Sequence, residues 1–402
     1  MDLFLGFLFC WSLILSPKLG FVDLSILFPA LILLLLPFKS KICIAKPFQW
    51  LLFFLCFILS YQIVLQVIVG NTIIGEILRH IKNISLVLII SVSFSIVPDR
   101  VKANFPIFVF YTLFSNSVLV LLCVLFPEIN SFLFSVTGVE PRYLRSSGLL
   151  AGFDIAGILS ITALSMLVFR VLSFPSKFAY IFFASILVIS SYFESRVSFA
   201  TCLCLWFFVF VSFCKNTSLL LPYRLIIAFL VTALLVPVVN DAAKLYDSTL
   251  KLNLFGLSVE ETNEYYSRSA AVTSDGFPWA DMFFLPASEF SILLGTGSET
   301  LASDVGYIKD VFRYGFFGIS LSFLSYLLFI SSCFRLADSS NKANRYRQLI
   351  KFLFLFLLLL NFKNSYFWVR AFSPSFIVLV ASLPAIYPSS RLLSGTSKNL
   401  NP

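Results

Sequence analysis

Long apolar runs recur along the whole chain and are separated by short polar stretches. A helix needs about 20 predominantly apolar residues to cross the hydrocarbon core of a bilayer. The runs therefore predict an all-α, polytopic integral membrane protein with about 12 transmembrane helices. These lie at residues 3–17, 19–37, 48–69, 81–97, 105–126, 149–169, 178–193, 198–214, 222–239, 306–334, 348–362 and 371–388.

One long polar segment divides the predicted spans into two groups. Residues 1–239 are expected to hold nine membrane helices, residues 240–305 one large loop, and residues 306–402 three further helices and a tail. The first span could be taken for a signal peptide. It lacks a basic start and an Ala-x-Ala-like cleavage site, and more spans follow it, so we interpret it as a helix.

Basic residues alternate from one predicted loop to the next. Lysine and arginine are retained in short cytoplasmic loops, so the basic loops mark the cytoplasmic side. This pattern predicts cytoplasmic termini and places the 240–305 loop on the opposite face of the membrane. The residues that carry the pattern are Lys39, Lys41, Lys46, Arg100, Lys102, Arg170, Lys177, Lys215, Arg224, Arg335, Lys342, Arg345, Arg347 and Lys351.

The composition excludes several other classes of protein. Hydrophobic residues make up 59% of the chain and charged residues 12%, which leaves no soluble domain. The net charge of +9 is spread over short loops, so we expect no nucleic-acid partner. The eight cysteines avoid the long loop, where an oxidising compartment would favour disulfides, so no disulfide framework is expected. Cys202 and Cys204 point to different helix faces and do not indicate a metal site.

Ionisable residues in a membrane protein mark candidate functional positions, because a charge at mid-bilayer costs at least about 2.5 kcal/mol. In this chain they gather at the outer ends of the predicted spans. The set is Asp23, Arg142, Arg145, Asp154, Glu194, Arg196, Arg268, Asp304, Lys309, Asp310 and Arg313. Glu194 and Arg196 lie in the short turn of Ser191–Phe199. That turn is either solvated, with a snorkelling arginine, or it places an anion-binding arginine beside an outer cavity.

The 240–305 loop has too many aromatic residues for a purely disordered segment. Tyr265, Tyr266, Phe277 and Trp279 offer flat surfaces for sugar rings, with packing against lipid headgroups as the alternative. Towards its end, Gly295 and Gly297 permit a tight turn. They do not form a dinucleotide-binding motif, because no third glycine follows.

Taken in order, these segments resemble the O-antigen polymerases (Wzy) of bacterial cell envelopes and the related O-antigen ligases. The match covers the topology of the whole chain and, at the level of motifs, residues 140–320. It comprises a Ser-Arg pair, a loop arginine, a Gly-x-Gly segment, and a helix that opens with a polar residue and a tyrosine and ends in Gly-aliphatic-Gly, for which this chain has Gly-Phe-Phe-Gly. The matching residues are Ser195-Arg196, Arg268, Gly295–Gly297, Asp304–Tyr307 and Gly315–Gly318.

The resemblance implies a GT-C-like fold in the bacterial inner membrane and a glycosyltransferase that acts at the periplasmic face. Its substrates would be oligosaccharides linked to undecaprenyl diphosphate, with membrane lipid and a chain-length regulator protein as partners. No metal or other cofactor is expected, because the lipid diphosphate is already an activated donor and arginines can stabilise it as it leaves. The implied catalytic residues are Asp304, Arg196 and Arg268, and the implied substrate-binding residues are Arg142, Arg145, Asp154, Glu194, Tyr265, Tyr266 and Tyr307.

Two alternatives stay open at this point. A flippase of lipid-linked sugars would also use outer arginines, although no internal repeat relates residues 1–200 to residues 201–402. The ligases carry His-Asn where this chain has Asp304-Val305, which favours the polymerase over the ligase. Asp304 could orient an acceptor hydroxyl or simply cap a helix. The single histidine, His80, has basic neighbours and is expected to lie at the membrane surface.

Overall fold

The protein is described by a computed structural model. It covers residues 2–15, 18–19, 22–35, 42–69, 74–137, 146–150, 152–172, 174, 176–214, 284–297, 306–361 and 371–388. Within these ranges the regular secondary structure is helical apart from two two-residue strands, β1 (Lys18–Leu19) and β2 (Val22–Asp23). The longer helices are α1 (Asp2–Leu15), α2 (Leu24–Leu35), α3 (Lys46–Val69), α4 (Ile74–Ile96), α6 (Phe105–Leu125), α7 (Pro127–Thr137), α8 (Phe153–Val168), α9 (Lys177–Glu194), α10 (Arg196–Cys214), α14 (Gly306–Leu336), α15 (Asn341–Leu360) and α16 (Phe372–Ile386). The short helices are α5 (Asp99–Lys102) and α13 (Glu289–Leu294).

Within the described ranges, four helices are long and apolar enough to cross a membrane, namely α3, α4, α6 and α14. The predicted all-α membrane protein is confirmed at this level. Each predicted span except residues 222–239, which lie outside the described residues, overlaps a helix. The main difference is at α4, which begins at Ile74 although its apolar run suggests a start near residue 81. This longer helix brings Glu76, Arg79 and His80 into the helical bundle.

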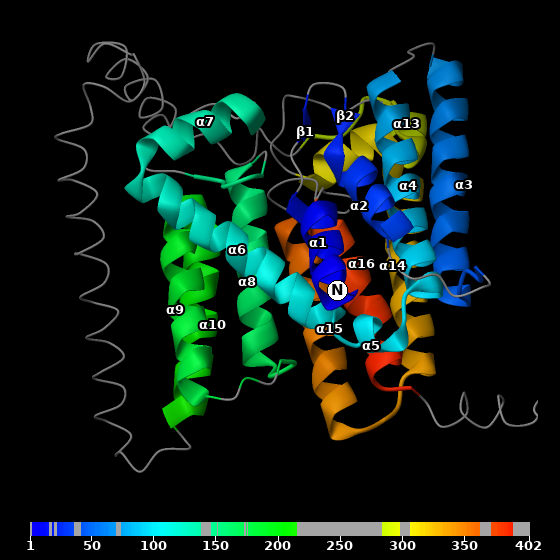
Figure 1. Ribbon diagram of the computed structural model, residues 1–402. Coiled ribbons are helices and arrows are strands. Elements are labelled where there is room, and N and C mark those ends of the chain that lie inside the picture. The colour runs from blue at the N-terminus through cyan, green and yellow to red at the C-terminus, as the bar shows by residue number, and fades with distance from the viewer. Residues whose placement is uncertain are drawn as a thin grey trace, which may run out of the picture. The chain divides into compact units, whose positions relative to one another are not determined.

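The chain forms two compact units. The first comprises Met1–Ser16, Val22–Thr112 and Pro278–Pro402, and the second comprises Pro17–Phe21 and Leu113–Phe277. In the first unit α14 packs against α3, α13 and α16, while α4 packs against α3, α2 and α16 (Figure 1). The aromatic side chains Phe48, Phe329 and Tyr326 are buried in this core. The unit therefore surrounds α14 with helices from both ends of the chain.

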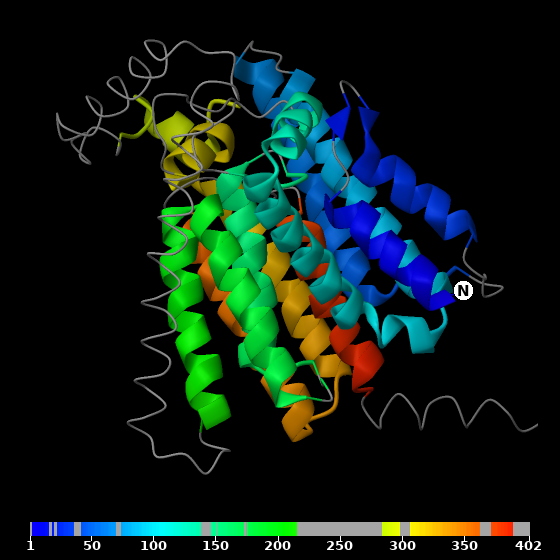
Figure 2. The same ribbon diagram turned by 60° about the vertical axis from the view of Figure 1, so that its left-hand side comes forward.

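The second unit is centred on α8, α9 and α10, which pack against one another (Figure 2). Small residues allow the close approach. A side-chain carbon added at Gly157 of α8 would collide with the hydroxyl of Ser198 on α10. Lipid tails are as apolar as leucine, so the hydrophobic effect does not drive helices together in a membrane. Their association depends instead on close packing, which small residues allow. Nearly all residues of α8 are buried, which fits a helix at the centre of its unit.

Candidate functional site

Helix α14 is broken at Gly315, whose backbone has φ 62° and ψ 178°. Only glycine adopts this conformation without strain. Gly295, with φ 87°, lies directly against the break. A side-chain carbon on Gly315 would collide with the carbonyl of Leu293, and one on Gly295 would approach the Gly315 nitrogen to 2.7 Å. The two glycines thus let the turn after α13 touch the backbone of the broken helix.

The backbone groups around the break are hydrogen-bonded. Thr296 donates to the carbonyl of Phe312 from its backbone nitrogen (2.6 Å) and from its hydroxyl (2.9 Å). The Tyr61 hydroxyl on α3 lies 3.3 Å from the carbonyl oxygen of Tyr314 and also contacts that of Leu294. Inside a membrane, non-helical backbone is tolerated only where protein or water satisfies it. These contacts therefore stabilise the break in α14 at Gly315.

Two glutamines on α3 complete the contact with the glycine turn. The side-chain nitrogen of Gln62 donates to the carbonyl of Gly297 at 2.9 Å, and that of Gln66 lies 3.4 Å from the same oxygen. Both side chains are fully or almost fully buried. A glutamine in an apolar helix is costly unless it is hydrogen-bonded. The Gly295–Gly297 segment, a weak signal in the sequence, is thus held by dedicated polar side chains.

Replacing Gly315 by alanine is expected to destabilise the first unit by more than about 3 kcal/mol, because strain at this backbone conformation adds to the clash with Leu293. The measurement is chemical unfolding of the purified protein in detergent. Gly75→Ala is the matched control, since a side-chain carbon added there in α4 would meet no other described part of the chain within 4 Å. It should match the wild type or gain up to about 1 kcal/mol. Equal stability of the Gly315→Ala and Gly75→Ala variants would contradict the proposed close contact.

A buried charged cluster lies next to the break. The side chain of Arg313 on α14 is fully buried, and its Nε atom lies 3.0 Å from a carboxylate oxygen of Glu76 on α4. Its Nη1 atom lies 3.6 Å from Asp310. Glu76 also faces Arg79 at 3.8 Å. Two arginines therefore meet two carboxylates, which offsets the cost of keeping these charges away from water.

The cluster extends to the end of α15 through Asn361. Its side-chain nitrogen donates to Asp310 at 2.9 Å, and its carbonyl accepts from the backbone nitrogen of Tyr307 at 3.0 Å. The Tyr307 hydroxyl donates to the carbonyl of Leu358 at 2.8 Å. The first amides of a helix have no partner within the helix. The carbonyl of Asn361 is such a partner for the amide of Tyr307, and this hydrogen bond fixes the start of α14 against α15.

His80 lies beside this cluster and not at the surface. Its side chain is fully buried, its ring centroid is 5.5 Å from that of Tyr314, and the two rings meet edge to face. Neither ring nitrogen has a hydrogen-bond partner among the described residues. The prediction of a surface histidine was wrong, because α4 starts earlier than its apolar run suggests. Arg313 pairs with Glu76, which lies one turn before His80 on the same helix.

In the second unit Glu194 ends α9 and is fully buried. Ser160 of α8 donates a hydrogen bond of 3.0 Å to one carboxylate oxygen, and the Ser117 hydroxyl lies 3.0 Å from that of Ser160. The second carboxylate oxygen has no hydrogen-bond partner among the described residues. The solvated turn considered above is therefore wrong for Glu194. Its carboxyl group instead reaches into the contact between α8 and α9.

The segment before α8 is anchored beside Glu194. The backbone nitrogen of Ser146 donates to the carbonyl of Phe193 at 3.2 Å. The Asn116 side chain accepts from the backbone nitrogen of Leu149 at 3.2 Å, next to Gly148 with φ 60°. The residues that follow Arg145 in the chain therefore meet the turn that contains Glu194. Two of the segments singled out in the sequence lie together in the second unit.

The structure describes only some of the remaining predicted site residues. Asp154 is half-buried in the first turn of α8, and Tyr307 is in the first turn of α14. Arg196 is the first residue of α10, and its side chain is outside the described set. The predicted residues that lie outside the described residues are Asp304, Arg268, Arg142, Arg145, Tyr265 and Tyr266.

The structure adds functional candidates that the sequence did not single out: Glu76, Asn361, Gln62 and Gln66. A signal for them existed, since each is a polar residue in or beside an apolar run. Among the described residues, no group of three or more His, Cys, Asp or Glu side chains could hold a metal ion. Comparison of the chain with family models, with curated proteins and with solved structures gave no match.

Proposed function

We propose that this protein polymerises lipid-linked oligosaccharide repeat units, as a membrane glycosyltransferase of the O-antigen polymerase (Wzy) type. The observation that carries the proposal is the assembly around Gly315. The Gly295–Gly297 turn packs directly against the Gly-x-x-Gly break inside α14, the helix whose first turn contains Tyr307. The resemblance rests on these same motifs in the same order. A common role in forming the contact region around Gly315 explains why these motifs occur together.

The proposed reaction transfers a growing glycan from undecaprenyl diphosphate to the incoming repeat unit. The bond between the anomeric carbon and the diphosphate oxygen breaks, and a glycosidic bond forms to a hydroxyl of the acceptor sugar. The diphosphate leaves with the electron pair, and the hydroxyl proton passes to a base. Arginine suits the leaving group because its planar fork pairs with phosphate oxygens through two hydrogen bonds.

We assign the diphosphate contacts to Arg196 and Arg268, with weaker help from Arg142 and Arg145. Asp304 orients the acceptor hydroxyl or accepts its proton, at a distance of about 3 Å in the complex. Tyr265 and Tyr266 provide stacking surfaces for sugar rings. These roles come from the resemblance and from the chemistry of the side chains. They require no metal or other cofactor.

The buried cluster has a positioning role in this proposal. Asp304 lies two residues before the first residue of α14 in the sequence. Asn361 holds the next turn of that helix through Tyr307 and Asp310, and Arg313 fixes Asp310 to α4 through Glu76. A catalytic group must be held within a fraction of an ångström by its supporting residues. The cluster provides that support for the segment that carries Asp304.

The second unit offers a comparable support for Arg196. Helix α9 ends at Glu194 and α10 begins at Arg196, so one residue, Ser195, forms the connection. The Ser195 and Ser198 hydroxyls lie 3.1 Å apart, and the Ser195 hydroxyl accepts from the Ser198 backbone nitrogen at 3.3 Å. The first turn of α10 is thereby capped by the serine of the Ser-Arg pair. Such a cap fixes the backbone direction at Arg196.

The proposed location is the bacterial inner membrane, with about 12 spans, cytoplasmic termini and a periplasmic loop at residues 240–305. This orientation follows from the basic loops. Alkaline phosphatase folds only on the periplasmic side, so a fusion after Thr273 should be active and a fusion after Ala343 inactive. Both fusions should be produced in equal amounts, as judged by immunoblot. The reverse pattern of activity would overturn the orientation and with it the proposed periplasmic reaction.

A flippase of lipid-linked sugars is the second candidate, and one observation favours it. Transporters often contain helices broken near the middle of the membrane, and α14 is broken at Gly315. A flippase would move a labelled lipid-linked unit across the bilayer without changing its length. A polymerase would extend the unit, and a ligase would transfer it to a different acceptor lipid. Product length after incubation of the purified protein with lipid-linked repeat units therefore distinguishes the three activities.

A further inference from the structure

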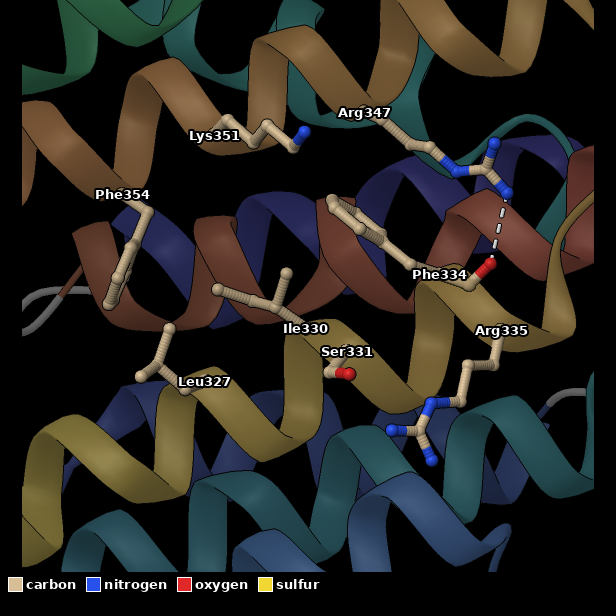
Figure 3. Close-up of a pocket in the computed structure, with 8 residues that line it drawn as sticks. All are labelled: Leu327, Ile330, Ser331, Phe334, Arg335, Arg347, Lys351 and Phe354. Atoms are coloured by element: carbon tan, nitrogen blue, oxygen red, sulfur yellow. Dashed lines mark hydrogen bonds between the residues drawn. The ribbon is translucent and has the colours of Figure 1, made fainter. Parts of the chain in front are cut away.

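A groove of about 380 Å³ lies between the end of α14 and α15, away from the cluster around Arg313. Its apolar lining is Leu327, Ile330, Phe334 and Phe354, with Ser331 at its floor. Three basic side chains border it, Arg335 from α14 and Arg347 and Lys351 from α15, and no acidic residue lines it. Figure 3 shows Arg347 and Lys351 extending from one wall and Arg335 from the other.

Arg347 links the two helices that form the groove. Its guanidinium donates to the carbonyl of Phe334 at 3.0 Å (Figure 3). It also donates to the carbonyl of Ala337 at 3.0 Å and to the side chain of Asn344 at 2.9 Å. The first two contacts satisfy carbonyls at the C-terminal end of α14, where the helix provides no partner. Arg347 therefore fixes the distance between the two helices while keeping its positive charge at the rim.

Arg335 and Lys351 do not link the two helices in this way. Both are exposed, and neither has an ion pair or a hydrogen bond within the part of the chain that the structure describes. The nearest acid in the sequence, Asp338, accepts a hydrogen bond from the backbone of Ser339 at 2.7 Å. The rim thus presents two uncompensated cations next to a third, above an apolar surface.

We propose that this groove binds an anionic phospholipid, with the phosphate between the cations and one acyl chain along the apolar floor. Basic pockets between transmembrane helices on the cytoplasmic side suit anionic lipid headgroups. Arg335 in the last turn of α14 and Arg347 and Lys351 in α15 flank the connection between these helices, which is the most basic loop of the sequence and is proposed to be cytoplasmic. Leu324 and Leu327, which are exposed on the same helix, continue the apolar surface. A zwitterionic lipid would add a positive headgroup charge next to three cations.

Native mass spectrometry of the purified protein in neutral detergent tests the proposal, with phosphatidylglycerol and phosphatidylcholine of identical chains as probes. Phosphatidylglycerol should bind more tightly. The double variant Arg335→Gln/Lys351→Gln should bind it roughly 30-fold more weakly, which is the effect expected for two cations near an anionic headgroup. Its affinity for phosphatidylcholine should not change. Equal affinity of the wild type for the two lipids would overturn the proposal.

Lys342→Gln/Arg345→Gln is the matched control, because it removes the same charge from exposed positions of the same helix outside the groove. It should weaken binding by less than about threefold. An equal loss in both double variants would mean a general surface attraction and would contradict a defined site. Ser331→Phe fills the floor and keeps all the cations, and it should also weaken phosphatidylglycerol binding. Displacement of the lipid by an equal concentration of glycerophosphoglycerol, which has no acyl chain, would reduce the groove to a phosphate site and overturn the lipid assignment.

Discussion

Replacing Arg313 by methionine should lower the free energy of unfolding by about 3–5 kcal/mol, the range observed when one partner of a buried ion pair is removed. Methionine fills a similar space, so the loss reflects charge more than volume. Glu76 and Asp310, now 3.0 Å and 3.6 Å from the guanidinium atoms, would lose this buried cation, although Glu76 would keep Arg79 and Asp310 would keep Asn361. Chemical unfolding in detergent measures the change.

Two further variants separate charge from packing. Arg335→Met changes the same residue type at an exposed position of the same helix and should cost less than about 0.5 kcal/mol. Adding Glu76→Gln and Asp310→Asn to Arg313→Met removes the stranded charges and should recover at least half of the lost stability. Wild-type stability in the Arg313→Met variant would show that the buried ion pairs do not hold α4 to α14.

The positions of most helices could be predicted from the sequence, because an apolar run of sufficient length is a direct physical requirement for a membrane helix. The start of α4 could not. Glu76, Arg79 and Lys82 interrupt the apolar pattern there, so the run points to a start near residue 81. The helix includes these residues because Arg313, far along the chain, neutralises Glu76. A tertiary partner of this kind leaves no local signal.

The candidate site was predictable in its motifs but not in its contacts. Gly295 and Gly297 lie near the end of a long loop in the sequence, and Gly315 belongs to a glycine motif in the helix predicted after it. Their function as contact points depends on positive φ angles and on the approach of two separate backbone segments, which a pattern of residues does not encode. The same holds for Glu194, whose burial depends on Ser160 of another helix. Polar residues in apolar runs, such as Gln62 and Gln66, carry a signal for these contacts that the prediction did not use.

The largest functional effect is expected at Asp304. Asparagine caps a helix about as well as aspartate does, so Asp304→Asn should leave folding nearly unchanged. If the carboxylate orients or deprotonates the acceptor hydroxyl, the variant should form roughly 10²–10⁴-fold less polymer, the usual contribution of a general base. Lipid-linked single repeat units should then accumulate as one short band. A full ladder from this variant would leave Asp304 with a capping role only.

The most direct measurement uses the purified wild-type protein in vesicles supplied with repeat units on undecaprenyl diphosphate. Electrophoresis of the products resolves each added unit as a separate band. A polymerase gives a ladder of lipid-linked glycans and releases one undecaprenyl diphosphate for each unit added, without any other protein. Transfer of the labelled units across the bilayer with no change in their length would contradict the proposed polymerase and identify a transporter.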